Sequence, residues 1–286
     1  YNPHSNRFNT GIRSLQTIAR FRWRSYKTNP LTMTVETRQP TIECALAHVD
    51  DEIDHVRAER DSFEDFLDRL DTIQTNGRVT PRTDGNHAVV TSLEASAPTE
   101  LQPIRRAYRE TVMGVSHYEQ EYGDTLRESL TVELGETVAT YVMDGQILSP
   151  MVRDTLRKAT NQCLAEREDF LRLLRQESGS LDAIANELNE LEARVVEIGN
   201  RIDATETSAQ LARIGEKLQR TEQRCTALAN RRQKRIHSRE NISLSGVDSA
   251  SLSQYLYTDM ETVTPALADI ASCIETIRYL RIRCLH

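Results

Sequence analysis

Seven apolar side chains at alternating steps of three and four residues constrain the fold of this 286-residue chain more than any other feature. They are Leu181, Ile184, Leu188, Leu191, Val195, Ile198 and Ile202. This spacing places them on a single stripe of an α-helix, and such a stripe has to be covered by another helix. A polar turn over residues 203–208 leads into a second apolar stripe. Because short connections join antiparallel neighbours, residues 181–236 are predicted to form a helical hairpin.

The hairpin is predicted to extend over residues 149–240. Ser149 and Pro150 are a helix start signal, since serine caps a helix and proline is tolerated at its first position. Ser178-Gly179-Ser180 consists of poor helix formers and marks either a hinge or a frayed point. An unbroken first helix of about 50 residues, rising about 1.5 Å per residue, would span roughly 75–80 Å.

The rest of the chain divides into shorter segments. They are a first coiled-coil helix at 40–75, a linker at 76–100, a small helical module at 101–145, a second linker at 241–254 and a C-terminal helix at 255–286. Within the module we expect one helix from about Pro103 to Tyr118 and a second one capped by Asp124. The linkers are assigned because they contain turn residues or serines without a sustained apolar period.

The low apolar content fits this organisation. Hydrophobic residues make up 38% of the chain and aromatic residues 5%, which argues against a thick, aromatic-rich globular core. No stretch approaches the roughly 18 apolar residues of a membrane span. The 11 glycines and 8 prolines are few, which disfavours turn-dense β folds. We therefore predict an all-α fold, an elongated helical bundle with a long antiparallel coiled-coil hairpin.

Charge and cysteine usage bear on the environment of the protein. The formal net charge is −7, and only four of the 36 basic residues are lysine. Lysine depletion with an acidic excess is typical of salt-loving proteomes, although GC-rich coding also raises the arginine content. The five cysteines are widely spaced and form no Cys-x-x-Cys motif, which indicates reduced thiols in helix packing. With no signal-peptide pattern either, we predict a cytoplasmic protein.

Residues 1–32 differ from the remainder, since they hold six basic residues, no acidic residue and the only tryptophan. One interpretation is a disordered tail or a segment upstream of the true start. A second is an arm for nucleic acid or a membrane surface, because Phe21 to Lys27 interleaves aromatic and cationic side chains. A third is an organellar transit peptide, which has this arginine-rich, acid-free composition.

Motifs of known enzyme classes are absent from the sequence. There is no phosphate loop, dinucleotide-binding glycine motif, His-Glu-x-x-His or Gly-x-Ser-x-Gly. His48, Glu52 and His55 share one strip of a helix and are the candidate metal ligands. Only one Glu-x-x-His is present, however, whereas di-iron bundles use two. His48 and His55 also lie outside the apolar stripe of this helix, so a position on its solvent-exposed face is favoured for both. No cofactor or metal is predicted.

Two further clusters are candidate interaction sites. The first consists of His117, Tyr118, Glu121 and Tyr122. Such carboxyl and imidazole groups can form an acid–base set, and the tyrosine rings can equally pack between helices or against a partner. The second is the basic run of Arg231, Arg232, Lys234 and Arg235. These cations suit nucleic-acid contact, but they also end a helix, where positive charge is favourable.

A resemblance to a known family rests on several stretches of sequence. They are Ala107-Tyr-Arg-Glu-Thr-Val-Met113, His117-Tyr118, Glu121-Tyr122, Glu133-Leu134-Gly135, His55-Val-Arg-Ala-Glu-Arg60-Asp-Ser-Phe63 and Tyr255-Leu-Tyr257. In these the chain resembles an uncharacterised domain-of-unknown-function family of halophilic archaea, over about residues 41–284. The family often has proline where this chain has Ser116, so the helix break before His117 is less sharply marked here. The resemblance implies a helical, cytoplasmic, halophilic protein and carries over no catalytic residue.

These observations favour a structural or protein-interaction protein, with the coiled coil as a scaffold or a dimerisation element. Its expected partner is another protein or a second copy of the chain. One alternative is a nucleic-acid-associated regulator that uses the 231–239 run or the arm at 20–27. A second alternative is a metal-dependent helical-bundle enzyme centred on His48, Glu52 and His55.

Overall fold

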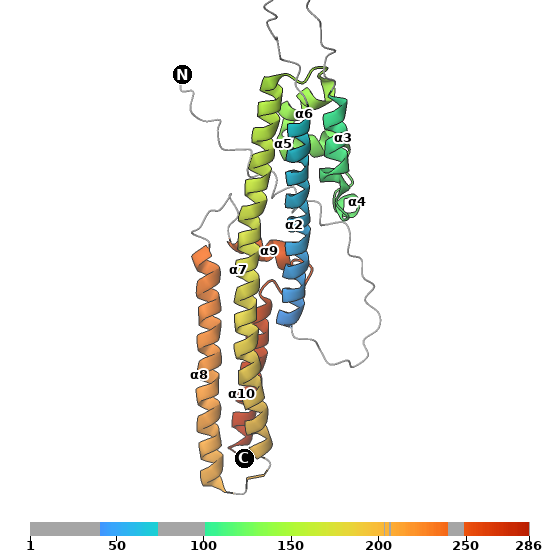
Figure 1. The fold of residues 1–286 in the computed structure, drawn as a ribbon. Helices are drawn as coiled ribbons and strands as arrows, with labels where there is room; N and C mark the ends of the chain where they lie inside the picture. Colours follow the sequence, from blue (N-terminus) through green and yellow to red (C-terminus); the bar gives the residue numbers. More distant parts are fainter. Residues whose placement is uncertain (1–40, 74–100, 203, 206, 240–248, 286) are drawn as a thin grey trace, which may run out of the picture. The chain divides into compact units, whose positions relative to one another are not determined.

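The computed structural model describes residues 41–73, 101–202, 204–205, 207–239 and 249–285 (Figure 1). Every regular element in these residues is helical, which confirms the all-α prediction. The elements are α2 (Thr41–Thr72), α3 (Gln102–Glu110), the 3₁₀ turn η2 (Val112–Gly114), α4 (Tyr118–Glu121), α5 (Leu126–Leu134), α6 (Glu136–Asp144), α7 (Pro150–Ile202), α8 (Ser208–Arg239), α9 (Ser249–Tyr257) and α10 (Pro265–Arg283). None of the described helices has both the length and the apolar character needed to cross a bilayer.

The chain divides into two compact units. Of the described residues, unit 1 holds those within 55–171, and unit 2 holds those within 41–54 and 172–285. The helices α2 and α7 therefore contribute residues to both units. The basic segment 1–32, the linker 76–100 and residues 241–248 of the second linker lie outside the described residues. Helix α9 begins at Ser249, inside the segment expected to be a linker.

Unit 1 is built around an antiparallel contact between its parts of α2 and α7. Arg60 of α2 donates to Glu168 of α7 at 2.7 Å, and Arg153 of α7 donates to the backbone oxygen of Asp71 at 2.7 Å. Helices α3, α5 and α6 cover the apolar side of this pair. The fully buried side chains of unit 1 include Phe63, Phe66, Leu70, Leu101, Ile104, Tyr108, Leu130, Leu148 and Leu156.

The small helical module is more broken than its sequence indicated. The continuous helix expected up to Tyr118 is wrong, because α3 ends at Glu110 and η2 and α4 follow separately. The second expected helix is divided by Gly135, whose φ of 89° is accessible to glycine and strained for other residues. Its cap is Thr125 rather than Asp124, since Thr125 forms a reciprocal capping box with Glu128.

Unit 2 contains the predicted hairpin, with α10 alongside it (Figure 1). The seven residues of the stripe over 181–202 are each at most 7% exposed. Arg231 of α8 pairs with Glu187 of α7, whereas Arg235, further along α8, donates to the backbone oxygen of Gln176. Residue numbers increase along α8 while those of the contacted residues on α7 decrease, so the hairpin is antiparallel, as predicted. Helix α7 passes through residues 178–180 without a break.

Helix α10 lies antiparallel to α8. Cys225 and Cys273 place their sulfur atoms 3.8 Å apart, and Arg278 and Arg281 both donate to Glu222, at 2.7 and 2.6 Å. All five cysteines are free thiols. The buried stripe of α10 comprises Ala266, Ile270, Cys273, Ile277 and Leu280. These buried residues of α10 recur at steps of four and three.

Candidate functional site

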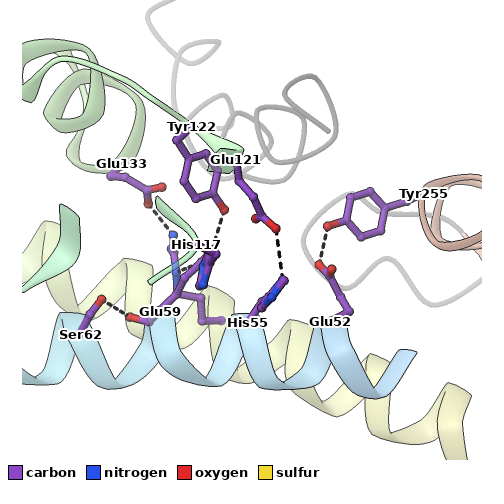
Figure 2. A network of polar contacts seen from close by, with 10 residues as sticks. Glu52, His55, Glu59, Ser62, His117, Glu121, Tyr122, Glu133 and Tyr255 are labelled. Carbon is purple, nitrogen blue, oxygen red and sulfur yellow. Dashed lines mark hydrogen bonds and ion pairs between the residues drawn. The ribbon is translucent and has the colours of Figure 1, made fainter. Parts of the chain in front are cut away.

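A buried carboxylate, Glu59, lies at the centre of a polar cluster in unit 1 (Figure 2). Its Oε1 accepts a hydrogen bond from the Tyr122 hydroxyl at 2.6 Å and lies 3.3 Å from Nε2 of His117. Its Oε2 accepts from Nε of Arg167 at 3.1 Å. Helix α2 positions Glu59 and α7 positions Arg167, while His117 and Tyr122 flank the short helix α4. Three segments far apart in sequence therefore meet at one carboxyl group.

Opposing effects set the ionisation of Glu59. Burial by itself raises the pKa of this carboxyl, because the charged form loses its hydration. The hydrogen bond to His117, the charge of Arg167 and the hydrogen bond from Tyr122 act in the other direction and hold the pKa at about 2. Glu59 is consequently a carboxylate at neutral pH.

Arg167 joins a second carboxyl group to the cluster. Its Nη2 donates to Glu133 at 2.9 Å, and its guanidinium carbon lies 4.4 Å from the centroid of the Phe63 ring. Burial raises the pKa of Glu133, although Arg167 opposes this shift. The single guanidinium charge is thus shared between two buried carboxyl groups.

Two imidazole rings stack beside Glu59. The ring centroids of His55 and His117 are 4.5 Å apart with an interplanar angle of 24°. On its other side, Nδ1 of His55 lies 3.2 Å from Oε1 of Glu121. The His55 ring therefore lies between the carboxyl group of Glu121 and the ring of His117.

Three residues of this cluster have the composition of a metal site. Glu59, His117 and Glu121 each provide one ligand atom, and these atoms all lie within 4.8 Å of one another. Two of the three residues are buried, and Glu121 is half-buried. Carboxylate oxygen and imidazole nitrogen are common ligands of zinc and of other divalent transition metals.

The structure regroups the predicted metal residues. His55 belongs to the polar cluster of unit 1, whereas Glu52, in unit 2, accepts a hydrogen bond from Tyr255. His48 is half-buried in unit 2. His48, Glu52 and His55 therefore do not form one ligand set among the described residues, and the compatible set lies elsewhere.

The interaction residues predicted at 117–122 contribute directly to the cluster. His117, Glu121 and Tyr122 make the contacts given above, and Tyr118 is buried with its ring centroid 5.3 Å from that of Tyr122. Pattern reading of the sequence missed Glu59, Glu133 and Arg167.

A signal for Glu59 does exist in the sequence. Ala45, Glu52, Glu59 and Phe66 recur at steps of seven on α2, and all four are buried. This line lies beside the apolar stripe of the helix. Two acidic residues on a line that begins with alanine and ends with phenylalanine indicate buried carboxylates that require partners.

The predicted basic run is largely engaged with α7. Arg232 is only 3% exposed and is paired with Glu177, which also accepts a hydrogen bond from Tyr257 at 2.7 Å. Arg231 and Arg235 contact α7 as described above, and Lys234 is exposed. The guanidinium of Arg232 is thus placed inside unit 2 rather than on its surface. The arm at 20–27 lies outside the described residues.

Unit 2 also has a groove between α8 and the end of α10, here called the α8–α10 groove. It is lined by Leu211, Ala212, Gly215, Glu216, Gln219, Arg278, Arg281, Ile282, Cys284 and Leu285. Its volume is about 530 Å³. Ile282 and Leu285 are 56% and 83% exposed, so the groove presents apolar side chains to solvent.

Comparison with known proteins identifies a family without a described activity. A family model described as "Domain of unknown function (DUF7260)" matches residues 40–281, which is most of the chain. No curated protein and no solved structure gives a significant match.

Proposed function

The chain belongs to this family of unknown function, and from the geometry of unit 2 we propose that it is a helical interaction protein that pairs with a second copy through the α8–α10 groove. The exposure of Ile282 and Leu285 beside the groove carries the proposal. Exposed apolar side chains beside a groove with a polar border are typical of contact sites between proteins.

The shape of the groove suits an apolar side chain from another helix. Ala212 and Gly215 line its α8 side, and a Cβ atom added to Gly215 would meet no other atom within 4 Å. On the other side, Arg278 and Arg281 are held by Glu222. The small residues on α8 leave the groove open, and the ion pairs with Glu222 hold the two arginine side chains in place. The groove therefore has room for an apolar side chain of a partner helix.

The charges around the groove favour a second copy as the occupant. Glu216, which pairs with Arg220, borders it on α8, and Arg278 and Arg281, which both pair with Glu222, border it on α10. If the two-fold axis of a dimer passes through the groove, Glu216 of one copy can approach the arginines of the other. A rim that carries both signs of charge supports this self-complementary contact.

Measurement of molar mass by light scattering and sedimentation equilibrium tests this proposal. We expect a concentration-dependent dimer for the native chain and a monomer for I282E/L285E, because two buried carboxylates would oppose the contact. M151E is the matched control, since Met151 is an apolar residue of unit 1 that is 77% exposed. A native chain that stays monomeric at all concentrations, or a double variant that still dimerises, would contradict the proposal.

We also propose a halophilic origin and a cytoplasmic location for the protein. The acidic excess and the lysine depletion support the first. Five free thiols, three of them buried, support the second, because reducing compartments preserve free cysteines.

A further inference from the structure

We propose that Glu59, His117 and Glu121 bind one divalent transition-metal ion of the zinc class. The proposal concerns unit 1 and does not depend on the self-association proposed for unit 2. It rests on donor type, on the spacing of the donor atoms and on the charge around them.

The spacing of the donor atoms approaches that of a metal-bound set. Bonds of about 2.0 Å from a tetrahedral zinc ion place its donors about 3.3 Å apart. The distance between Oε1 of Glu59 and Nε2 of His117 is 3.3 Å, so this pair already has the required separation. One donor atom from each of the three residues lies within 4.8 Å of the other two, so the third ligand needs only a short side-chain movement.

Glu121 is the ligand best able to make this movement. Its side chain is 34% exposed, and it ends the four-residue helix α4. By contrast, Glu59 and His117 have side chains that are 8% and 6% exposed and are held within the unit. A fixed pair of ligands and a half-exposed third one also give the ion a path from solvent.

The two carboxylate oxygens of Glu59 face different groups. Arg167 contacts Oε2, whereas Oε1 lies 3.3 Å from Nε2 of His117 and accepts a hydrogen bond from the Tyr122 hydroxyl. An ion bound by both Glu59 and His117 would therefore lie on the Oε1 side of the carboxylate.

Charge balance points in the same direction. Glu59 and Glu121 contribute two carboxyl groups, while the charge of Arg167 is shared with Glu133. One divalent ion would neutralise the charge of the two carboxylates.

His55 acts as a positioning residue for the third ligand. Its Nδ1 lies 3.2 Å from Oε1 of Glu121, and its ring stacks on the ligand His117. Removing a group that orients a metal ligand in this way typically weakens metal binding about 10–100-fold.

Zinc titration of the tag-free, chelator-treated full chain tests the site. Competition with a chromophoric chelator should give one zinc per chain, and zinc should raise Tm. We expect H117A and E121Q each to weaken zinc binding at least 100-fold and H55A to weaken it about 10–100-fold. Far-UV circular dichroism of the metal-free variants checks that they fold.

Two control variants separate the site from general acidity and from stray histidines. E119Q neutralises an exposed neighbour of Glu121, and H237A removes an exposed histidine of α8, so both should bind zinc like the native chain. If H117A does not fold, the zinc affinity of E121Q tests the proposal instead, because the side chain of Glu121 is partly in solvent and its replacement should not prevent folding. Absence of stoichiometric zinc, or native affinity in a folded E121Q, would overturn the proposal.

Discussion

Replacing Arg232 with methionine probes the buried ion pair of unit 2. The side chains of Arg232 and Glu177 are each 2% exposed and are joined by contacts of 2.5 and 3.1 Å. Ser180 accepts from Arg232 at 3.2 Å, and Tyr257 donates to Glu177 at 2.7 Å. R232M leaves the carboxylate of Glu177 buried without its cation, which costs about 3–5 kcal/mol of unfolding free energy.

The double variant E177M/R232M distinguishes a lost charge partner from lost packing. It removes both charges, so it should be more stable than R232M although it carries one more substitution. A residual cost of about 1–3 kcal/mol is expected from the Tyr257 hydroxyl, which loses its acceptor. Adding Y257F should recover most of that remainder.

Urea unfolding followed by circular dichroism at 222 nm provides the free energies, with the m value as a check on two-state behaviour. A coupling energy between Glu177 and Arg232 of at least about 2 kcal/mol is expected from the double-mutant cycle. A cost below about 1 kcal/mol for R232M would match an exposed pair. That result, or additive single costs, would refute the assignment of a buried, mutually dependent pair.

Three further predictions concern the backbone, acid and salt. G135A should lower the free energy of unfolding by about 1–3 kcal/mol, because φ at this position is 89°. G179A, inside α7 where an added Cβ meets no atom within 4 Å, should leave it unchanged or raise it by up to about 1 kcal/mol. Urea unfolding of both variants measures these differences. Hydrogen bonds from Arg278 and Arg281 lower the pKa of Glu222 in the folded chain. The ionised Glu222 therefore stabilises the fold above its unfolded pKa, and this stabilisation is lost as pH falls through its folded pKa. Measured against pH, the Tm of E222Q should fall less in acid than the Tm of the native chain. The Tm of the native chain should rise from low to molar KCl as salt screens its net charge of −7, and a flat profile would count against the halophilic origin.

Local periodicity accounts for what the sequence revealed about the hairpin. Apolar side chains recur on both sides of Gly179, so this glycine does not end α7. In the module at 101–145 the segments are short, so single residues decide the boundaries. Gly135 adopts a positive φ, and the Thr125–Glu128 capping box starts α5 one residue later than expected. Short elements depend on such contacts more than on a repeating pattern.

The candidate metal site was only partly accessible from the sequence. His55 was a candidate because of its helical spacing with His48 and Glu52, and residues 117–122 were candidates because polar and aromatic side chains are dense there. Glu59 lies 58 positions from His117 and 108 from Arg167, and no spacing rule connects such distances. The candidate triplet of His48, Glu52 and His55 followed helical spacing, but the helix passes through both units and its side chains face different partners.

By itself, the sequence determined that the chain is helical and that its longest stripe must be covered by an antiparallel neighbour. Burial of apolar stripes drives that choice, and the stripes can be read directly from residue order. Only the tertiary structure decided which charged residues are buried together, such as Glu59 with Arg167 and Glu177 with Arg232. A buried charge is tolerated only when a partner reaches it, and that partner is set by helix packing rather than by position in the chain.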